Sequence, residues 1–156
     1  MKNMNKKLIL AIFVFACSIG TSAVVLSTFS GASNNPAVEQ QIVICKIIVL
    51  AMTFVLVLIA DNALVKDARS AVKQFQRKNV SNILKEGTFK AGRYLNISGI
   101  VITFSCLTNQ MLSILQTIPL SWSITVMVIG AILYIVGASL ILLAGPSAFE
   151  EDMTAQ

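Results

Sequence analysis

The sequence contains no histidine and few charged residues. Without histidine there can be no His-ligated haem or metal site, no Ser-His or Cys-His catalytic pair and no histidine pH switch. Charged residues make up 12% of the chain, against about 25% in soluble domains. Apolar residues make up 56% of the 156 residues, more than a soluble domain of this length could bury. The composition therefore indicates a protein whose solvent is lipid.

Other signatures of chemistry are missing as well. Cys17, Cys45 and Cys106 all lie in apolar runs, and an odd count there favours small buried side chains over disulfides. The sequence has no Gly-rich phosphate loop, no CxxC pair and no carboxylate pair inside an apolar segment. A serine or cysteine nucleophile would therefore need a lysine or another unusual base. We expect no catalytic residue, no metal site and no cofactor, and we predict that the protein is not an enzyme.

Four apolar segments each approach the length of about 20 residues that a helix needs to cross a membrane. A helix satisfies its own backbone hydrogen bonds in lipid, so the sequence predicts an all-α integral membrane protein with three to four transmembrane helices. The prolines Pro36, Pro119 and Pro146 all lie outside these segments. The predicted organisation is a signal peptide or signal-anchor helix (1–32), a short extracytoplasmic segment (33–41), a transmembrane helix (42–60), a basic cytoplasmic loop with an amphipathic helix (61–94), a polar-faced transmembrane helix (95–118), an outer turn (119–123), a transmembrane helix (124–145) and an acidic cytoplasmic tail (146–156).

The first segment has two interpretations. Its basic start, its apolar stretch and the small residues at 21–23 and 30–32 are typical of a secretory signal with a cleavage site. Its uncharged run is longer than the about 7–15 residues usual in such signals, which favours an uncleaved anchor. The mature protein therefore has three spans if the segment is removed and four if it is retained.

Basic residues gather on one predicted side of the membrane. Lys2, Lys6 and Lys7 open the chain, and eight more basic residues fall between Asp61 and Tyr94. The predicted outer segments contain no lysine or arginine. Under the positive-inside rule, the N-terminal start and the C-terminus both lie in the cytoplasm. We expect the protein in a bacterial inner membrane.

The basic loop carries a helical pattern. Val65, Ala68, Val72 and Phe75 recur at helical spacing, which indicates an apolar stripe that continues the preceding span. Such a helix could bind anionic lipid headgroups or an acidic partner, or its charges could serve only to fix topology. Few aromatic residues accompany the charge, so no nucleic acid partner is expected. The candidate lipid- or partner-binding residues are Lys66, Arg69, Lys73, Arg77 and Lys78.

The third apolar segment has a polar face. Ser98, Ser105, Asn109 and Gln116 are spaced by seven, four and seven residues, so they share one side of a helix. Polar groups in hydrocarbon must find partners. The face therefore either bonds another helix or lines a polar pathway, and it has no ionisable group for proton relay.

The fourth apolar segment carries small residues at a strict interval of seven, namely Ser123, Gly130, Gly137 and Ala144. A stripe of small residues lets another helix backbone approach closely. The partner could be the preceding segment of the same hairpin or a neighbouring subunit, so self-association is one expected use of this face.

The order of features along residues 2–93 resembles the small pilins of bacterial type IV secretion and conjugation systems. The resemblance rests on the signal-like residues 2–32, the polar segment 34–41, Cys45 and Lys46 at the start of the next span, and the basic loop 66–93. It implies a small, non-enzymatic membrane subunit of a bacterial envelope assembly, with a basic loop that meets phospholipid headgroups and possible assembly into an extracellular filament. The longer loop and the extra span at 124–145 depart from that family. The alternatives are a small solute transport protein that uses the polar face, and a scaffold that binds anionic lipid or an acidic partner.

Overall fold

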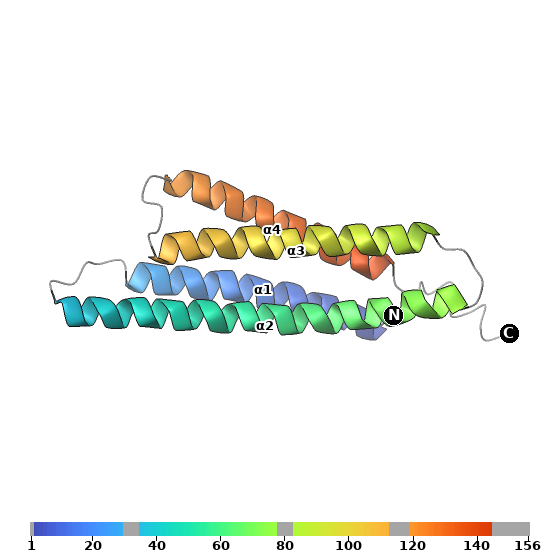
Figure 1. Cartoon of the computed structure of the whole chain (residues 1–156), viewed down its shortest axis with the longest axis horizontal. Helices are drawn as coiled ribbons and strands as arrows, with labels where there is room; N and C mark the ends of the chain where they lie inside the picture. The colour runs from blue at the N-terminus through green and yellow to red at the C-terminus, as the bar shows by residue number, and fades with distance from the viewer. Residues whose placement is uncertain (1, 30–34, 78–82, 113–118, 145–156) are drawn as a thin grey trace.

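A computed structural model describes residues 2–29, 35–77, 83–112 and 119–144. This part of the chain is all-α and consists of α1 (Lys2–Thr28), α2 (Pro36–Arg77), α3 (Ile83–Leu112) and α4 (Leu120–Leu143). Each helix contains a stretch that is long and apolar enough to cross a membrane. The helices lie along one long axis with alternating direction, so that the start of α1, the end of α2, the start of α3 and the end of α4 share one end of the bundle (Figure 1).

Two helices begin at residues whose chemistry suits a helix start. The side-chain oxygen of Asn35 accepts a hydrogen bond of 3.0 Å from the backbone N–H of Ala37, which satisfies a donor that the first turn leaves free. Pro36 opens α2, where its missing N–H costs nothing. Pro119 is the N-cap residue of α4. Pro36 and Pro119 thus mark helix starts, in keeping with their position outside the predicted spans, and Pro146 lies outside the described residues.

The helices extend beyond the predicted spans. α2 has 42 residues, which corresponds to a length of about 63 Å, twice the roughly 30 Å of hydrocarbon in a bilayer. The stretch 61–77, predicted to continue the preceding span as a helix within the basic loop, is a direct continuation of α2. In it Val65, Ala68 and Val72 are buried while Lys66 and Arg69 are exposed. α4 begins at Leu120, so most of the predicted turn 119–123 is helical.

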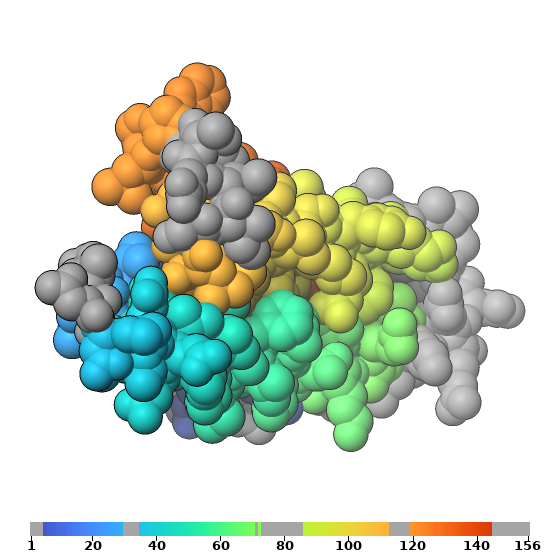
Figure 2. All heavy atoms as spheres, turned by 60° about the vertical axis from the view of Figure 1, so that its left-hand side comes forward, coloured from blue at the N-terminus to red at the C-terminus, as the bar shows by residue number. Residues whose placement is uncertain are grey.

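The core forms where all four helices meet. α3 and α4 make the most extensive helix pair and α1 and α2 the second, with α2 also lying beside α3 (Figures 1 and 2). α2 is the least covered helix, because only 11% of its most apolar window is buried, against 39% in α3. One core cluster includes Phe15 of α1, Val57 of α2 and Tyr134 of α4, and a second includes Leu64 of α2 and Ile141 of α4.

Candidate functional site

An ion pair between Asp61 and Arg93 joins α2 to α3. The Arg93 guanidinium donates a hydrogen bond to Oδ2 of Asp61. The Asp61 side chain is 2% exposed and that of Arg93 is 29% exposed. A charge at this depth in an apolar bundle is costly unless it is paired, so the position of one residue dictates that of the other. The pair therefore fixes α2 against the α3–α4 hairpin.

Further polar groups surround this pair, and we call Asp61, Arg93, Asn96 and Tyr134 the buried polar cluster. Asn96 faces the Asp61 carboxylate, and Tyr134 of α4 lies within electrostatic reach of it. Both side chains are fully buried. Among the described residues, Oδ1 of Asp61, both amide atoms of Asn96 and the Tyr134 hydroxyl have no hydrogen-bond partner of ordinary geometry. The cluster thus draws on three helices, with one ion pair between α2 and α3 and polar atoms of unused bonding capacity on α2, α3 and α4.

Glycines bring α3 and α4 into backbone contact beside the cluster. A Cβ atom built on Gly137 would lie 2.3 Å from the backbone nitrogen of Asn96, and one built on Gly99 would lie 2.4 Å from that of Tyr134. A Cβ on Gly130 would lie 2.5 Å from the Thr103 hydroxyl oxygen. A side chain at Gly137 or Gly99 would require a helix to move, and one at Gly130 would require at least the Thr103 side chain to shift. The small residues that sequence analysis singled out on α4, Gly130 and Gly137, therefore lie against α3 of the same chain.

The two outer members of that small-residue stripe are buried too. Ser123, in the first turn of α4, is 5% exposed, and its hydroxyl oxygen accepts a 2.6 Å hydrogen bond from the Gln110 amide of α3. Ala144 follows the last turn of α4 and is 0% exposed. The whole stripe is thus covered by this chain.

Charged residues of α1, α2 and α3 gather at one end of the bundle, which we call the charged end. Lys7 of α1 lies 2.5 Å from the carboxylate of Asp67 in α2, and Lys90 lies 2.8 Å from Glu86 one turn away. Lys66 and Arg69 are exposed there. Of the other basic candidates, Lys73 and Arg77 belong to α2 but their side chains are not described, and Lys78 lies outside the described residues.

The predicted polar face of α3 is divided between the exterior and a groove. Ser98 and Ser105 are exposed, Asn109 is partly buried, and Gln116 lies outside the described residues. Ser105, Thr108 and Asn109 lie on one wall of a groove of about 600 Å³ between α2 and α3, which we call the α2–α3 groove. The opposite wall comes from α2, and the full lining is Ile47, Leu50, Ala51, Phe54, Val101, Phe104, Ser105, Thr108 and Asn109.

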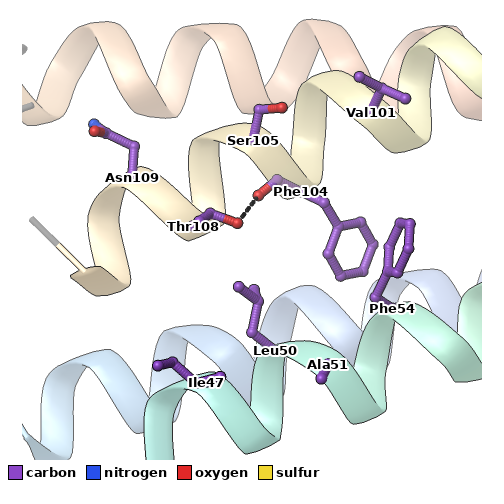
Figure 3. A pocket seen from close by; sticks show the side chains of 9 residues that line it. All are labelled: Ile47, Leu50, Ala51, Phe54, Val101, Phe104, Ser105, Thr108 and Asn109. Carbon is purple, nitrogen blue, oxygen red and sulfur yellow. Dashed lines mark hydrogen bonds between the residues drawn. The ribbon is translucent and has the colours of Figure 1, made fainter. Parts of the chain in front are cut away.

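The interior of the α2–α3 groove is apolar. Figure 3 shows the rings of Phe54 and Phe104 next to each other between α2 and α3, where they pack edge to face with centroids 5.0 Å apart. The Asn109 side chain points away from α2. The Thr108 hydroxyl is already used, since it donates to the Phe104 carbonyl at 2.7 Å. The groove therefore offers shape and apolar surface, with polar atoms confined to one wall.

A second pocket, of about 450 Å³, lies between α1 and the α3–α4 hairpin at the opposite end from the charged end. Its wall is apolar apart from a few uncharged polar side chains, among them Ser22, Gln110 and Ser123. We call it the α1 pocket.

Sequence analysis did not single out the buried polar cluster, although a signal for it exists. Gly92, Asn96, Gly99 and Thr103 recur at spacings of four, three and four, and all four are buried. This stripe lies next to the predicted polar face and matches the heptad spacing of Gly130 and Gly137. Asp61 directly follows the predicted span 42–60, but its pairing with Arg93 depends on how two distant segments pack. That packing cannot be read from local spacing.

The described residues contain no group of three or more acidic or cysteine side chains that could hold a metal ion. A comparison of the chain with protein-family models, with curated proteins and with solved structures finds no match. The resemblance to the secretion and conjugation pilins is not confirmed by these comparisons and rests on the order of sequence features alone. The structural class is that of an all-α protein with four helices able to span a membrane.

Proposed function

We propose that the protein is a non-enzymatic subunit of a larger membrane assembly, and that the α2–α3 groove takes a transmembrane helix of a partner protein. The observation that carries the proposal is the groove itself. α2 is fastened to α3 at Asp61 and Arg93, but between Ile47 and Phe54 the two helices leave about 600 Å³ unfilled. A bundle that worked alone would close such a gap, because packing is what holds helices together in lipid.

The lining of the groove suits a helix. Ala51 of α2 and Ser105 of α3 are small, and small residues let a neighbouring backbone approach closely. Most of the remaining lining is apolar, with the rings of Phe54 and Phe104 packed edge to face, so the apolar face of a helix can pack into the groove. We further propose, from the resemblance, that the assembly is a secretion or conjugation complex of a bacterial inner membrane, with the charged end in the cytoplasm.

The experiment is site-specific photo-crosslinking in cells at native expression. A photoreactive residue at Ile47 or Val101, both exposed in the groove, should give a crosslink to one protein band of defined mass. The same residue at Ile132, which is exposed on α4 outside the groove, should not. The proposal would be refuted if the photoreactive residue in the groove labels only lipid and the protein is extracted in detergent as a monomer.

A pair of neighbouring substitutions provides a matched control. Ala51→Trp fills the groove, whereas Met52→Trp adds the same bulk to an adjacent exposed position outside it. We expect Ala51→Trp to reduce recovery of the partner by at least fivefold and Met52→Trp to leave it unchanged. Equal recovery from both variants would count against the groove as the docking site.

One further observation favours a second function, the binding of anionic lipid at the charged end. Lys66 and Arg69 are exposed on a helix that continues directly out of a span, and each such cation near an anionic surface contributes about 1 kcal/mol. Replacing both by glutamine should lower the amount of phosphatidylglycerol that copurifies. Lys90→Gln serves as the control, because Lys90 is paired with Glu86, and a loss equal to that of the double variant would reject the assignment.

Solute transport through the polar face of α3 receives less support. Ser98 and Ser105 are exposed on the outside of the four-helix unit, and the side chains lining the two pockets are mostly apolar. A path along this face would need another subunit to close it. Flux of a small solute into liposomes that contain the purified protein alone would revive this alternative.

A further inference from the structure

We propose that the α1 pocket binds a neutral, single-chain amphiphile, an acyl chain that ends in an uncharged hydrogen-bonding head such as the glycerol of a monoacylglycerol. This inference is independent of the proposed partner helix, because it concerns a different cavity, lined by α1, α4 and other residues of α3. The pocket is built from three helices and has a volume of about 450 Å³, within the range of about 300–1,000 Å³ in which proteins enclose small ligands.

The first argument is the unused polar atom in its wall. The Ser22 side chain is 1% exposed, and its hydroxyl oxygen has no hydrogen-bond partner among the described residues. Neighbouring hydroxyls of α1 behave differently, since Ser18 and Thr21 each donate to the carbonyl one turn earlier at 2.8 Å. A buried hydroxyl without this bond carries a free-energy cost, because it has lost its hydration and has no partner in the protein. A ligand atom can supply the missing partner.

The second argument is the absence of charge in the lining. The full lining is Ile19, Ser22, Ala23, Leu26, Ser27, Cys106, Leu107, Gln110, Met111, Leu120, Ser123, Ile124 and Met127. It contains no lysine, arginine, aspartate or glutamate. A charged headgroup would lose its hydration there without gaining a counter-ion, which is strongly unfavourable in an apolar site. The head must therefore be uncharged. Its hydrogen bond goes to Ser22, because the Gln110 amide already donates to the Ser123 hydroxyl at 2.6 Å and the Ser27 hydroxyl donates to the Val24 carbonyl at 2.9 Å.

The third argument is the depth of the polar atoms along the helices. Gln110 and Ser123 lie in the last turn of α3 and the first turn of α4, within about 5 Å of the helix ends. Ile19 and Met127 lie deeper, about 10–14 Å from the ends of α1 and α4. The 2.6 Å bond from Gln110 to Ser123 holds this polar rim in place. Ser22 lies between these levels, about 9 Å from the end of α1, so a head that bonds its hydroxyl lies just inside the rim and the chain reaches further inward, in the orientation of a lipid in the surrounding bilayer.

The test uses 1-monoacylglycerol with a diazirine in its acyl chain, added to the purified full-length protein in nanodiscs, followed by mapping of the labelled peptides. We expect labelling to concentrate in residues 19–27, 106–111 and 120–127, and unlabelled monoolein to compete it away. A lysophosphatidylglycerol of the same chain length should compete at least tenfold less well. Labelling spread evenly over lipid-facing positions such as Ile9, Ile48 and Ile132 would overturn the proposal.

Matched variants locate the site. Ala23→Phe fills the pocket from α1, while Val24→Phe adds the same ring at the next exposed position, which does not line the pocket. Ala23→Phe should reduce specific labelling at least tenfold and Val24→Phe should not. Ser22→Ala removes only the free hydroxyl and should lower competition by monoolein several-fold. If Ser22→Ala has no effect, the assignment of a hydrogen-bonding head is wrong, and if Ala23→Phe has none, the pocket is not the site.

Discussion

The ring of Phe15 in α1 stacks on that of Tyr134 in α4, with centroids 4.1 Å apart and planes inclined by 15°. Both side chains are buried, to 3% and 0% exposure. The stack belongs to a stripe of buried α1 residues, namely Ala11, Phe15, Ser18 and Ser22, at spacings of four, three and four. α1 therefore packs into the four-helix unit along this face and is not an appendage at its surface.

The Phe15–Tyr134 stack predicts a specific loss of stability in Phe15→Ala. In lipid, the lost apolar contact is partly replaced by acyl chains, so the expected cost is that of the aromatic pair, about 1 kcal/mol. Steric trapping or denaturant titration of the purified protein in detergent measures this change. Phe13→Ala is the matched control, because Phe13 is 63% exposed on the same helix. Equal losses in the two variants would show that the stack contributes nothing of its own.

The same packing predicts that α1 stays in the folded protein. Removal of residues 1–23 or 1–32 would take away the partner of Tyr134 and the cation that faces Asp67. It would also open one wall of the α1 pocket. The intact mass of protein extracted from membranes decides the question. A mass that lacks either segment would contradict this expectation and would support cleavage of a signal.

The buried ion pair predicts an asymmetry between single and double substitutions. Asp61→Leu leaves the Arg93 cation without a partner in a mostly buried position, which should cost about 3 kcal/mol or more. Asp61→Leu combined with Arg93→Leu removes both charges and should recover most of that loss. Stability in detergent and the yield of folded protein are the measurements. A double variant no better than the single one would mean that the pair is not the reason for the loss.

A surface pair serves as the comparison for this experiment. Lys90→Leu removes the partner of Glu86, and both side chains are well exposed to solvent. Exposed pairs contribute little, so no measurable loss is expected. The contrast separates the effect of burying a charge from that of removing a positive residue from α3.

The sequence predicts the coarse fold well for reasons that are local. Helical class, four candidate spans and helix starts near Pro36 and Pro119 follow from apolar length and backbone chemistry. The helical spacing of Val65, Ala68 and Val72 predicts that α2 continues beyond its span, and all three side chains are buried. Function and membrane side stay predictions. They depend on partners and orientation that the four helices do not contain.

The features that escaped prediction are those that join distant segments. Their spacing places Ser98, Ser105 and Asn109 on one face of α3. The buried polar side chains among the described residues of α3 are instead those of Asn96 and Thr103, on an adjacent stripe. Hydrophobic periodicity cannot choose between these stripes, because both are uncharged and both recur at seven. The choice is made by Gly130 and Gly137 of α4, whose missing side chains admit only one stripe of α3.

That close approach yields the sharpest prediction of the packing. Gly137→Ala places a methyl group 2.3 Å from the Asn96 backbone nitrogen and 2.7 Å from its Cα, so α4 must move away from α3. The expected cost is about 1–3 kcal/mol, with displacement of Asn96 from the Asp61 carboxylate as a secondary effect. Gly20→Ala is the control, because a Cβ at Gly20 would meet nothing within 4 Å and alanine favours a helix. Unfolding in detergent should therefore shift to lower denaturant concentration for Gly137→Ala and stay level or rise for Gly20→Ala. If the two variants behave alike, α3 and α4 do not pack through this glycine stripe.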